Sequence, residues 1–273
     1  MPQTPSRSST RHATRRLHNS RAWRGLARTG FAVNGLLHIL IGAIALQLAL
    51  PGGSDADADQ GGALESLATT PFGGVLLWIV TVGLAALGLW LIVDGILDRP
   101  DDGAAQHVAV ALAKGLTYLA LAVTAGRVAL GGRGDSSGDA QSATAALLEA
   151  PGGVVLVILA GLAVLAIGVY FGVKGVTQGF RDDIDTPGGA AGKAVVALGV
   201  GGYLAKGVAL GALGVLLGSA AIASDSARTT GLDGALRSLL ELPFGGYVLG
   251  GVGVGLIAYG VYCFARARYA RLD

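Results

Sequence analysis

The chain has 273 residues, of which 52% are hydrophobic and only 14% are charged, and its formal net charge is +2. Soluble globular domains carry roughly 25% charged residues, so this composition argues against a soluble protein. Cys263 is the only cysteine, which excludes an intrachain disulfide and a zinc or redox motif built on paired cysteines.

The first segment, residues 1–25, is rich in Ser, Arg, Thr and His and has no apolar periodicity. This composition predicts a disordered basic tail. Each arginine near an anionic leaflet is attracted by about 1 kcal/mol, so we expect the tail to contact anionic lipid. Nucleic acid is a less favoured partner, because Trp23 is the one aromatic residue among these arginines.

Six long apolar segments follow, and each reaches the roughly 20 residues that a transmembrane helix needs. They are residues 29–50, 72–97, 108–130, 152–177, 194–223 and 244–265. The prediction is therefore an all-α integral membrane protein with six transmembrane helices.

The six segments are one helix pair written three times. Three landmarks keep the same spacing in every copy: a glycine in the first helix, a proline before the second, and a glycine within the second. These landmarks are Gly35, Pro71 and Gly88, then Gly115, Pro151 and Gly168, then Gly207, Pro243 and Gly260. We assign repeat 1 to residues 26–97, repeat 2 to 108–177 and repeat 3 to 194–268. Parallel repeats predict an approximate threefold axis along the membrane normal.

Positive charge is distributed unequally between the two sides of the predicted bundle. The termini and the loops between repeats carry most of the Lys and Arg; besides the N-terminal arginines, these are Arg99, Arg181, Lys193, Arg266, Arg268 and Arg271. The loop within repeat 1 is acidic, with Asp55, Asp57, Asp59 and Glu65. The positive-inside rule then places both termini in the cytoplasm of a cell-membrane protein.

A short amphipathic segment precedes the proline in each repeat, at residues 63–67, 144–148 and 235–239. The apolar spacing predicts interfacial helices on the outer side, which pack together as a cover. The proline is expected at or next to the first position of the following helix. Glycine is unusually abundant, with 46 residues, and predicts close helix packing within the chain. A membrane protein partner or a homo-oligomer is the alternative use of the same faces.

Polar residues within the spans recur at equivalent positions of the repeats. Near the cytoplasmic edge they predict a polar ring of Asn34, Asp94, Lys114, Lys174, Lys206 and Arg266. Charges in a membrane indicate functional sites by default, although long Lys and Arg side chains can instead extend to the interface. We expect Asp94 to pair with Lys114 or Lys206.

His38 lies one helical turn beyond Asn34, and no second histidine is placed within a span to form a bis-histidine haem site. We expect a hydrogen-bonded packing histidine, no cofactor and no metal. Lys114, Thr117, Tyr118 and Thr124 share one face of the third span. That face either lines a cavity or has threonines bonded to their own helix.

These residues resemble a known family. The segments Gly30–His38, Leu112–Tyr118 and Gly202–Gly207, each followed by the glycine-rich second helix, are similar to domain of unknown function 1206. The resemblance implies a bacterial membrane protein of three two-helix units with no established activity. Repeat 1 departs from the other copies, with Asn34 and Asp94 where they carry cations.

The sequence contains no catalytic constellation, so we expect a protein that is not an enzyme. The favoured function is a membrane scaffold or partner-binding protein. The alternative is a small permease, or a protein that binds an anion or a lipid headgroup at the basic ring.

Overall fold

The computed structural model describes residues 21–53, 56–97 and 104–270, except for the side chains of 21–27, Asp94, Leu97 and Ala104. The described residues form long helices joined by short helices and turns. The long helices are α2 (Arg21–Ala49), α4 (Gly73–Leu97), α5 (Ala104–Ala129), α7 (Gly153–Val176), α8 (Gly189–Ala223) and α10 (Gly245–Tyr269). The predicted helical class is confirmed for this part of the chain.

Each long helix is long and apolar enough to cross a membrane. The predicted and observed spans agree to within a few residues, because long runs of Leu, Val, Ala and Ile leave no polar break within a helix. Two ends differ from the prediction. Helix α2 begins at Arg21, inside the predicted tail, and α8 begins at Gly189. Residues 1–20 of that tail lie outside the described residues.

Short helices lie between the two long helices of each repeat. They are α3 (Gln60–Ala68), α6 (Ser136–Glu149), α9 (Gly231–Ser238) and the single turns η2 (Ser226–Arg228) and η3 (Leu239–Glu241). We call this layer the lid and its side the lid side. The side on which α2 begins and α10 ends is the terminal side. Helix α6 contacts both α3 and α9, so the lid segments of the three repeats pack together as predicted.

The link from lid to second long helix is the same in each repeat, but it differs from the prediction. The proline does not begin the helix; the residue after it adopts a left-handed conformation, with φ of 71° at Phe72, 75° at Gly152 and 61° at Phe244. The helix then begins at the next glycine. A Cβ atom on that glycine would meet the backbone of the preceding lid segment, as at Gly73, where the Ala68 carbonyl oxygen would be 2.9 Å away. Close approach of the two backbones therefore requires glycine here.

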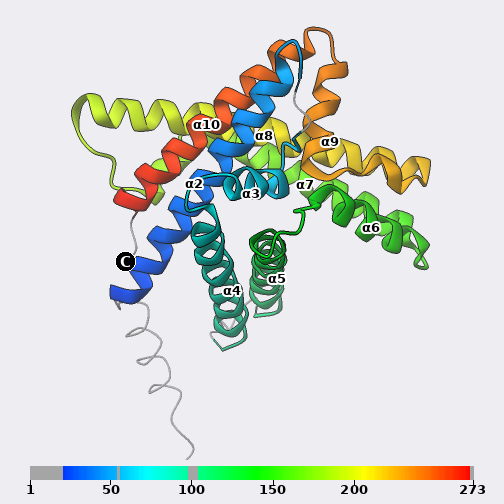
Figure 1. Ribbon diagram of the computed structural model, residues 1–273, viewed down its shortest axis with the longest axis horizontal. Coiled ribbons are helices and arrows are strands. Elements are labelled where there is room, and N and C mark those ends of the chain that lie inside the picture. The colour runs from blue at the N-terminus through cyan, green and yellow to red at the C-terminus, as the bar shows by residue number, and fades with distance from the viewer. Residues whose placement is uncertain (1–20, 54–55, 98–103, 271–273) are drawn as a thin grey trace, which may run out of the picture.

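The long helices pack most extensively between repeats and not within them. Helix α4 packs along α5, α7 along α8 and α10 along α2 (Figure 1). The second helix of each repeat thus packs on the first helix of the next, and the third repeat returns to the first. The sequence predicted a helix pair within each repeat as the unit. In the structure, the two helices of repeats 1 and 2 contact each other far less than they contact their neighbours.

Landmark glycines lie at the centre of all three close pairs. A Cβ added to Gly115 would lie 2.8 Å from the Gly88 carbonyl oxygen, and one added to Gly207 would lie 2.8 Å from that of Gly168. One added to Gly35 would lie 2.7 Å from the Gly260 carbonyl oxygen. These contacts leave no room for a side chain, as expected where helix backbones touch in the absence of a hydrophobic force. The prediction of close packing within the chain is confirmed at these glycines.

Helix α8 also packs along α10, so α2, α7, α8 and α10 form one block. The α4–α5 pair stands beside this block (Figure 1) and is joined to it mainly through α3 and α2. This asymmetry leaves one side of α5 uncovered.

A central polar chamber as the candidate functional site

A cavity of about 400 Å³ lies among α2, α5 and α8, the first long helices of the three repeats. Helix α10 contributes Leu256 to its wall, and the lid contributes Gln60 and Leu232. We call this cavity the chamber. Its lining is Asn34, His38, Ile41, Gln60, Ala113, Lys114, Thr117, Tyr118, Leu121, Lys206, Ala209, Leu210, Leu232 and Leu256. Its volume is within the range of small-molecule sites, roughly 300–1,000 Å³.

Half of the predicted polar ring meets in this chamber. Asn34, Lys114 and Lys206 occupy equivalent positions of the three repeats, and all three line it. The equivalent residues one turn closer to the lid, His38, Tyr118 and Leu210, line it as well. The positions that the repeat alignment made equivalent in the three first helices therefore line one cavity.

Lys206 enters the chamber from α8 among aromatic rings. Its Nζ lies 3.4 Å from the Tyr259 hydroxyl oxygen, 4.6 Å from the Tyr259 ring centroid and 4.8 Å from that of Phe171. Aromatic faces attract a cation but do not neutralise it. No carboxylate lies within ion-pair distance of Lys206 or Lys114 among the side chains that the structure describes. Among the described side chains, no carboxylate therefore neutralises the charges of Lys114 and Lys206.

Asn34 and His38 are fixed by contacts with α10 and with their own helix. The Asn34 amide donates to the Cys263 sulfur at 3.3 Å. The His38 Nδ1 lies 2.8 Å from the Asn34 carbonyl oxygen, and because a carbonyl only accepts, Nδ1 carries the proton. The His38 ring also packs at 4.7 Å from the Tyr259 ring. The expected packing histidine is found, and it lines the chamber besides.

The polar face of α5 combines both interpretations that the sequence left open. Lys114, Thr117 and Tyr118 line the chamber. The Thr117 hydroxyl nevertheless donates to the Ala113 carbonyl oxygen of its own helix at 2.8 Å. Thr124 bonds to the Ala120 carbonyl oxygen in the same way and is buried outside the chamber.

Lys174 and Arg266 do not join the chamber. Both contact Asp183 of η1 (Gly179–Asp183), with Oδ2 2.8 Å from Lys174 Nζ and 3.4 Å from Arg266 Nη2. The guanidinium of Arg266 also lies 4.5 Å from the Phe31 ring centroid. The sequence treated the loop that carries Asp183 as having no motif, and the shared carboxylate was missed. The Asp94 side chain lies outside the described residues, so its predicted ion pair stays a prediction.

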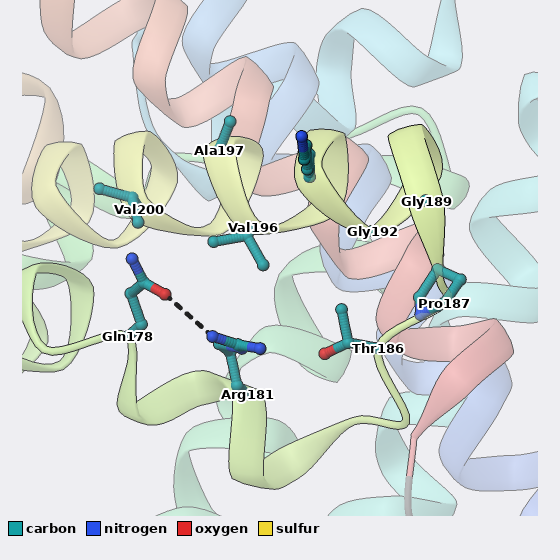
Figure 2. A pocket seen from close by; sticks show the side chains of 10 residues that line it. Gln178, Arg181, Thr186, Pro187, Gly189, Gly192, Val196, Ala197 and Val200 are labelled. Atoms are coloured by element: carbon teal, nitrogen blue, oxygen red, sulfur yellow. Dashed lines mark hydrogen bonds between the residues drawn. The ribbon is translucent and has the colours of Figure 1, made fainter.

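A second hollow, of about 660 Å³, lies on the terminal side between η1 and the first turns of α8 (Figure 2). Val196 of α8 points toward Arg181 and Gln178, whose side chains are joined by a hydrogen bond of 3.3 Å. Lys193 is also part of its lining. It is built from the linker between repeats 2 and 3 and from the start of repeat 3, whereas all three repeats contribute to the chamber.

The lid closes over the chamber through hydrogen bonds between repeats. Asp233 of α9 accepts from the Ala58 amide at 2.8 Å and from Arg237 Nε at 2.7 Å. Asp59 caps the N-terminus of α3 by accepting from the Gly62 amide, and its second oxygen accepts from the Ser137 hydroxyl of α6 at 3.3 Å. All three repeats therefore meet at these two buried carboxylates.

Asp59 gives the lid a predicted pH dependence. Burial raises the pKa of Asp59 to about 6, and the Asp57 and Asp233 carboxylates add to this effect. A raised carboxyl pKa favours the protonated folded state, so this contribution to stability is complete below pH 3.8 and is lost as pH rises through 6. The difference amounts to about 3 kcal/mol at most. Thermal unfolding from pH 4 to 7 should show this loss, and Asp59→Asn, which keeps the cap, should remove it. If the melting temperature of Asp59→Asn falls with pH as steeply as that of the unsubstituted protein, the pH dependence comes from other groups.

Comparison with known proteins identifies three internal repeats in the chain. Residues 29–98, 109–178 and 201–270 each match the family described as Domain of Unknown Function (DUF1206). The chain belongs to the DUF1206 family. It is also 28% identical over 256 residues to the uncharacterised protein YxxB of Bacillus subtilis (strain 168), covering 90% of each chain. No solved structure matches the chain. The predicted family and the three internal repeats are thus confirmed. Neither the family description nor the name of the Bacillus relative states an activity.

Proposed function

We propose that this DUF1206 protein binds an anion in the chamber, without catalysing a reaction on it. The observation that carries the proposal is that Lys114 and Lys206 line one cavity and have no ion-pair partner among the described side chains. Removing a charge from water without compensation is costly, so an anion between the two ammonium groups would lower the free energy of the site. Asn34 and the Tyr118 hydroxyl supply further polar groups in the same lining.

The proposal places the protein in the cell membrane with both termini in the cytoplasm, as the charge distribution predicts. The terminal side is then cytoplasmic, and the lid faces outward. The N-terminal arginines would contact anionic lipid on the cytoplasmic leaflet. We also propose an approximate threefold axis through the chamber. Its support is the cyclic order of the close helix pairs, in which the third repeat packs on the first.

The scaffold function predicted from the sequence ranks second on the geometry. Its motivation was the abundance of glycine, and contacts within the chain already account for landmark glycines in all three close helix pairs. A membrane protein partner and a homo-oligomer stay predictions.

The test uses purified protein in a nonionic detergent with a panel of anions: inorganic phosphate, glycerol phosphate, dodecyl phosphate and phosphatidylglycerol. At least one should raise the melting temperature. Lys114→Met and Lys206→Met should each weaken that binding by about tenfold or more, because each removes a charged contact worth about 1.5–3 kcal/mol. Lys193→Met is the matched control, since it removes the same charge outside the chamber. The proposal would be rejected if no anion binds, or if both chamber variants bind the anion as tightly as the unsubstituted protein does.

A further inference from the structure

The charged residues of the chamber lie at one end. Lys114 and Lys206 lie with Asn34 at its terminal-side end, and Ile41, Leu121 and Leu232 lie nearer the lid, where Gln60 is the one polar residue that the lid adds to the lining. Along the long helices, the lining changes over two turns toward the lid from charged or amide side chains to aliphatic ones. A small hydrated anion would use only the polar end.

The polar end lies at the depth where a membrane lipid carries its headgroup. Lys114 stands about 22 Å from the lid-side end of α5 at 1.5 Å per residue, and the hydrocarbon core is about 30 Å thick. With the lid-side end of α5 placed at one edge of the hydrocarbon, the Lys114 Cα atom lies about 8 Å inside the terminal-side edge. A long lysine side chain covers most of that distance.

The lid and an aromatic cluster border the chamber along the membrane normal. The lid closes one end through the hydrogen bonds of Asp59 and Asp233 between repeats. On the terminal side of Lys206, aromatic rings fill the space between α8 and α10. Phe180 and Tyr203 stack at 5.3 Å between centroids, and Tyr203 packs edge-on against Tyr259 at 5.2 Å.

The side of the chamber along α5 is open. Three of its five lining residues on α5 are exposed, namely Ala113, Lys114 and Thr117, whereas Ala209 of α8 and Leu256 of α10 are buried. Helix α5 packs on α4 and under α3 and has no comparable packing on α8. A membrane-spanning helix faces lipid on its uncovered side, so this opening connects the polar end of the chamber to the bilayer.

From this polarity, depth and opening, we infer that the ligand is a single-chain anionic amphiphile that enters from the bilayer alongside α5. Its phosphate or carboxylate group lies between Lys114 and Lys206, and its chain extends toward Leu232 of the lid. This inference rests on the proposed function and names the substrate class of the same site. An amphiphile that enters sideways requires neither the lid nor the aromatic cluster to open.

The experiment compares dodecyl phosphate with inorganic phosphate on the full chain in a nonionic detergent, with bound ligand measured by native mass spectrometry. Dodecyl phosphate should bind at least about 100-fold more tightly, because burial of each methylene contributes about 0.8 kcal/mol before competition from detergent. Lys114→Met and Lys206→Met should reduce this binding, and Lys193→Met should not. Ala113→Trp should obstruct the opening and weaken dodecyl phosphate binding at least tenfold. Leu116→Trp, exposed on the same helix but outside the lining, is its control.

Each outcome decides between the two proposals. Equal affinity for the two phosphates, or no effect of Ala113→Trp, overturns the lateral amphiphile site and leaves the anion site standing. Binding of neither phosphate overturns the lateral amphiphile site, and the anion site is overturned with it when glycerol phosphate and phosphatidylglycerol also fail to bind. Dodecyl phosphate binding that survives both lysine substitutions also overturns both, because it would be nonspecific partition onto the apolar surface.

Discussion

Gly207→Leu is expected to abolish the close contact between α7 and α8 and to destabilise the protein by about 3 kcal/mol, the upper part of the range for overpacked sites. A Cβ at Gly207 would lie 2.8 Å from the Gly168 carbonyl oxygen and 2.9 Å from the Gly172 amide nitrogen. Both obstacles are backbone atoms, so no side-chain rotation relieves the clash. The measurement is thermal unfolding in detergent, together with the fraction of monodisperse protein after extraction.

Gly201→Leu is the matched control for this substitution. Gly201 lies on the same helix, and a Cβ there would meet no atom within 4 Å. Replacing a helical glycine at an open position should be neutral or should stabilise by about 0.5–1 kcal/mol. Equal destabilisation by the two substitutions would mean that α8 does not touch α7 at Gly207.

Asp183→Asn is expected to destabilise the protein by about 2–3 kcal/mol. It leaves the Lys174 and Arg266 charges near each other without the carboxylate that contacts both. Loss of one partner from a buried ion pair costs about 3–5 kcal/mol, and the estimate is lower here because the Asp183 side chain is 26% exposed.

The neighbouring substitution Asp182→Asn makes the same chemical change at an exposed position of η1. It should alter stability by less than about 0.5 kcal/mol. Denaturation of the two variants side by side, at the same pH, measures the difference. If the two variants unfold at the same temperature, the ion pairs of Asp183 with Lys174 and Arg266 do not hold η1 against α7 and α10.

The sequence predicted the helices, the repeats and the residues of one site because these depend on local patterns. Apolar length gave the six spans, and the fixed spacing of Gly35, Gly115 and Gly207 aligned the repeats. That alignment placed Asn34, Lys114 and Lys206 at one depth and on equivalent faces, and they meet in the chamber.

The choice of helix partner could not be predicted in the same way. Every long helix contains glycine, so glycine content is compatible with pairs inside a repeat and with pairs between repeats. In the structure Gly88 meets Gly115 of the next repeat, and Gly260 returns to Gly35 of the first. The packing of the third repeat on the first depends on the arrangement of all the long helices, not on the sequence of one segment.

The partner of Lys174 and Arg266 depends on a loop and was therefore missed. Asp183 reaches both cations because η1 folds back under α7 and α10, with the Asp185 amide donating to the Tyr269 carbonyl oxygen at 2.8 Å. No periodicity in the loop encodes that position. The hydrogen bonds of the lid could not be predicted either, because they join residues of different repeats, as Asp59 and Ser137 do.

The central claim is that the third repeat closes on the first, which brings three first helices around one chamber. Cys263 of α10 is the single cysteine, and its sulfur lies 3.3 Å from the Asn34 amide nitrogen of α2. Oxidation of the Asn34→Cys variant in membranes, followed by proteolysis in a loop between the two residues, measures this closure. The account predicts two fragments that stay joined until a reductant is added, whereas Val93→Cys on the exposed face of α4 gives no such link. Separate fragments, or a disulfide between two chains, would contradict the closed arrangement.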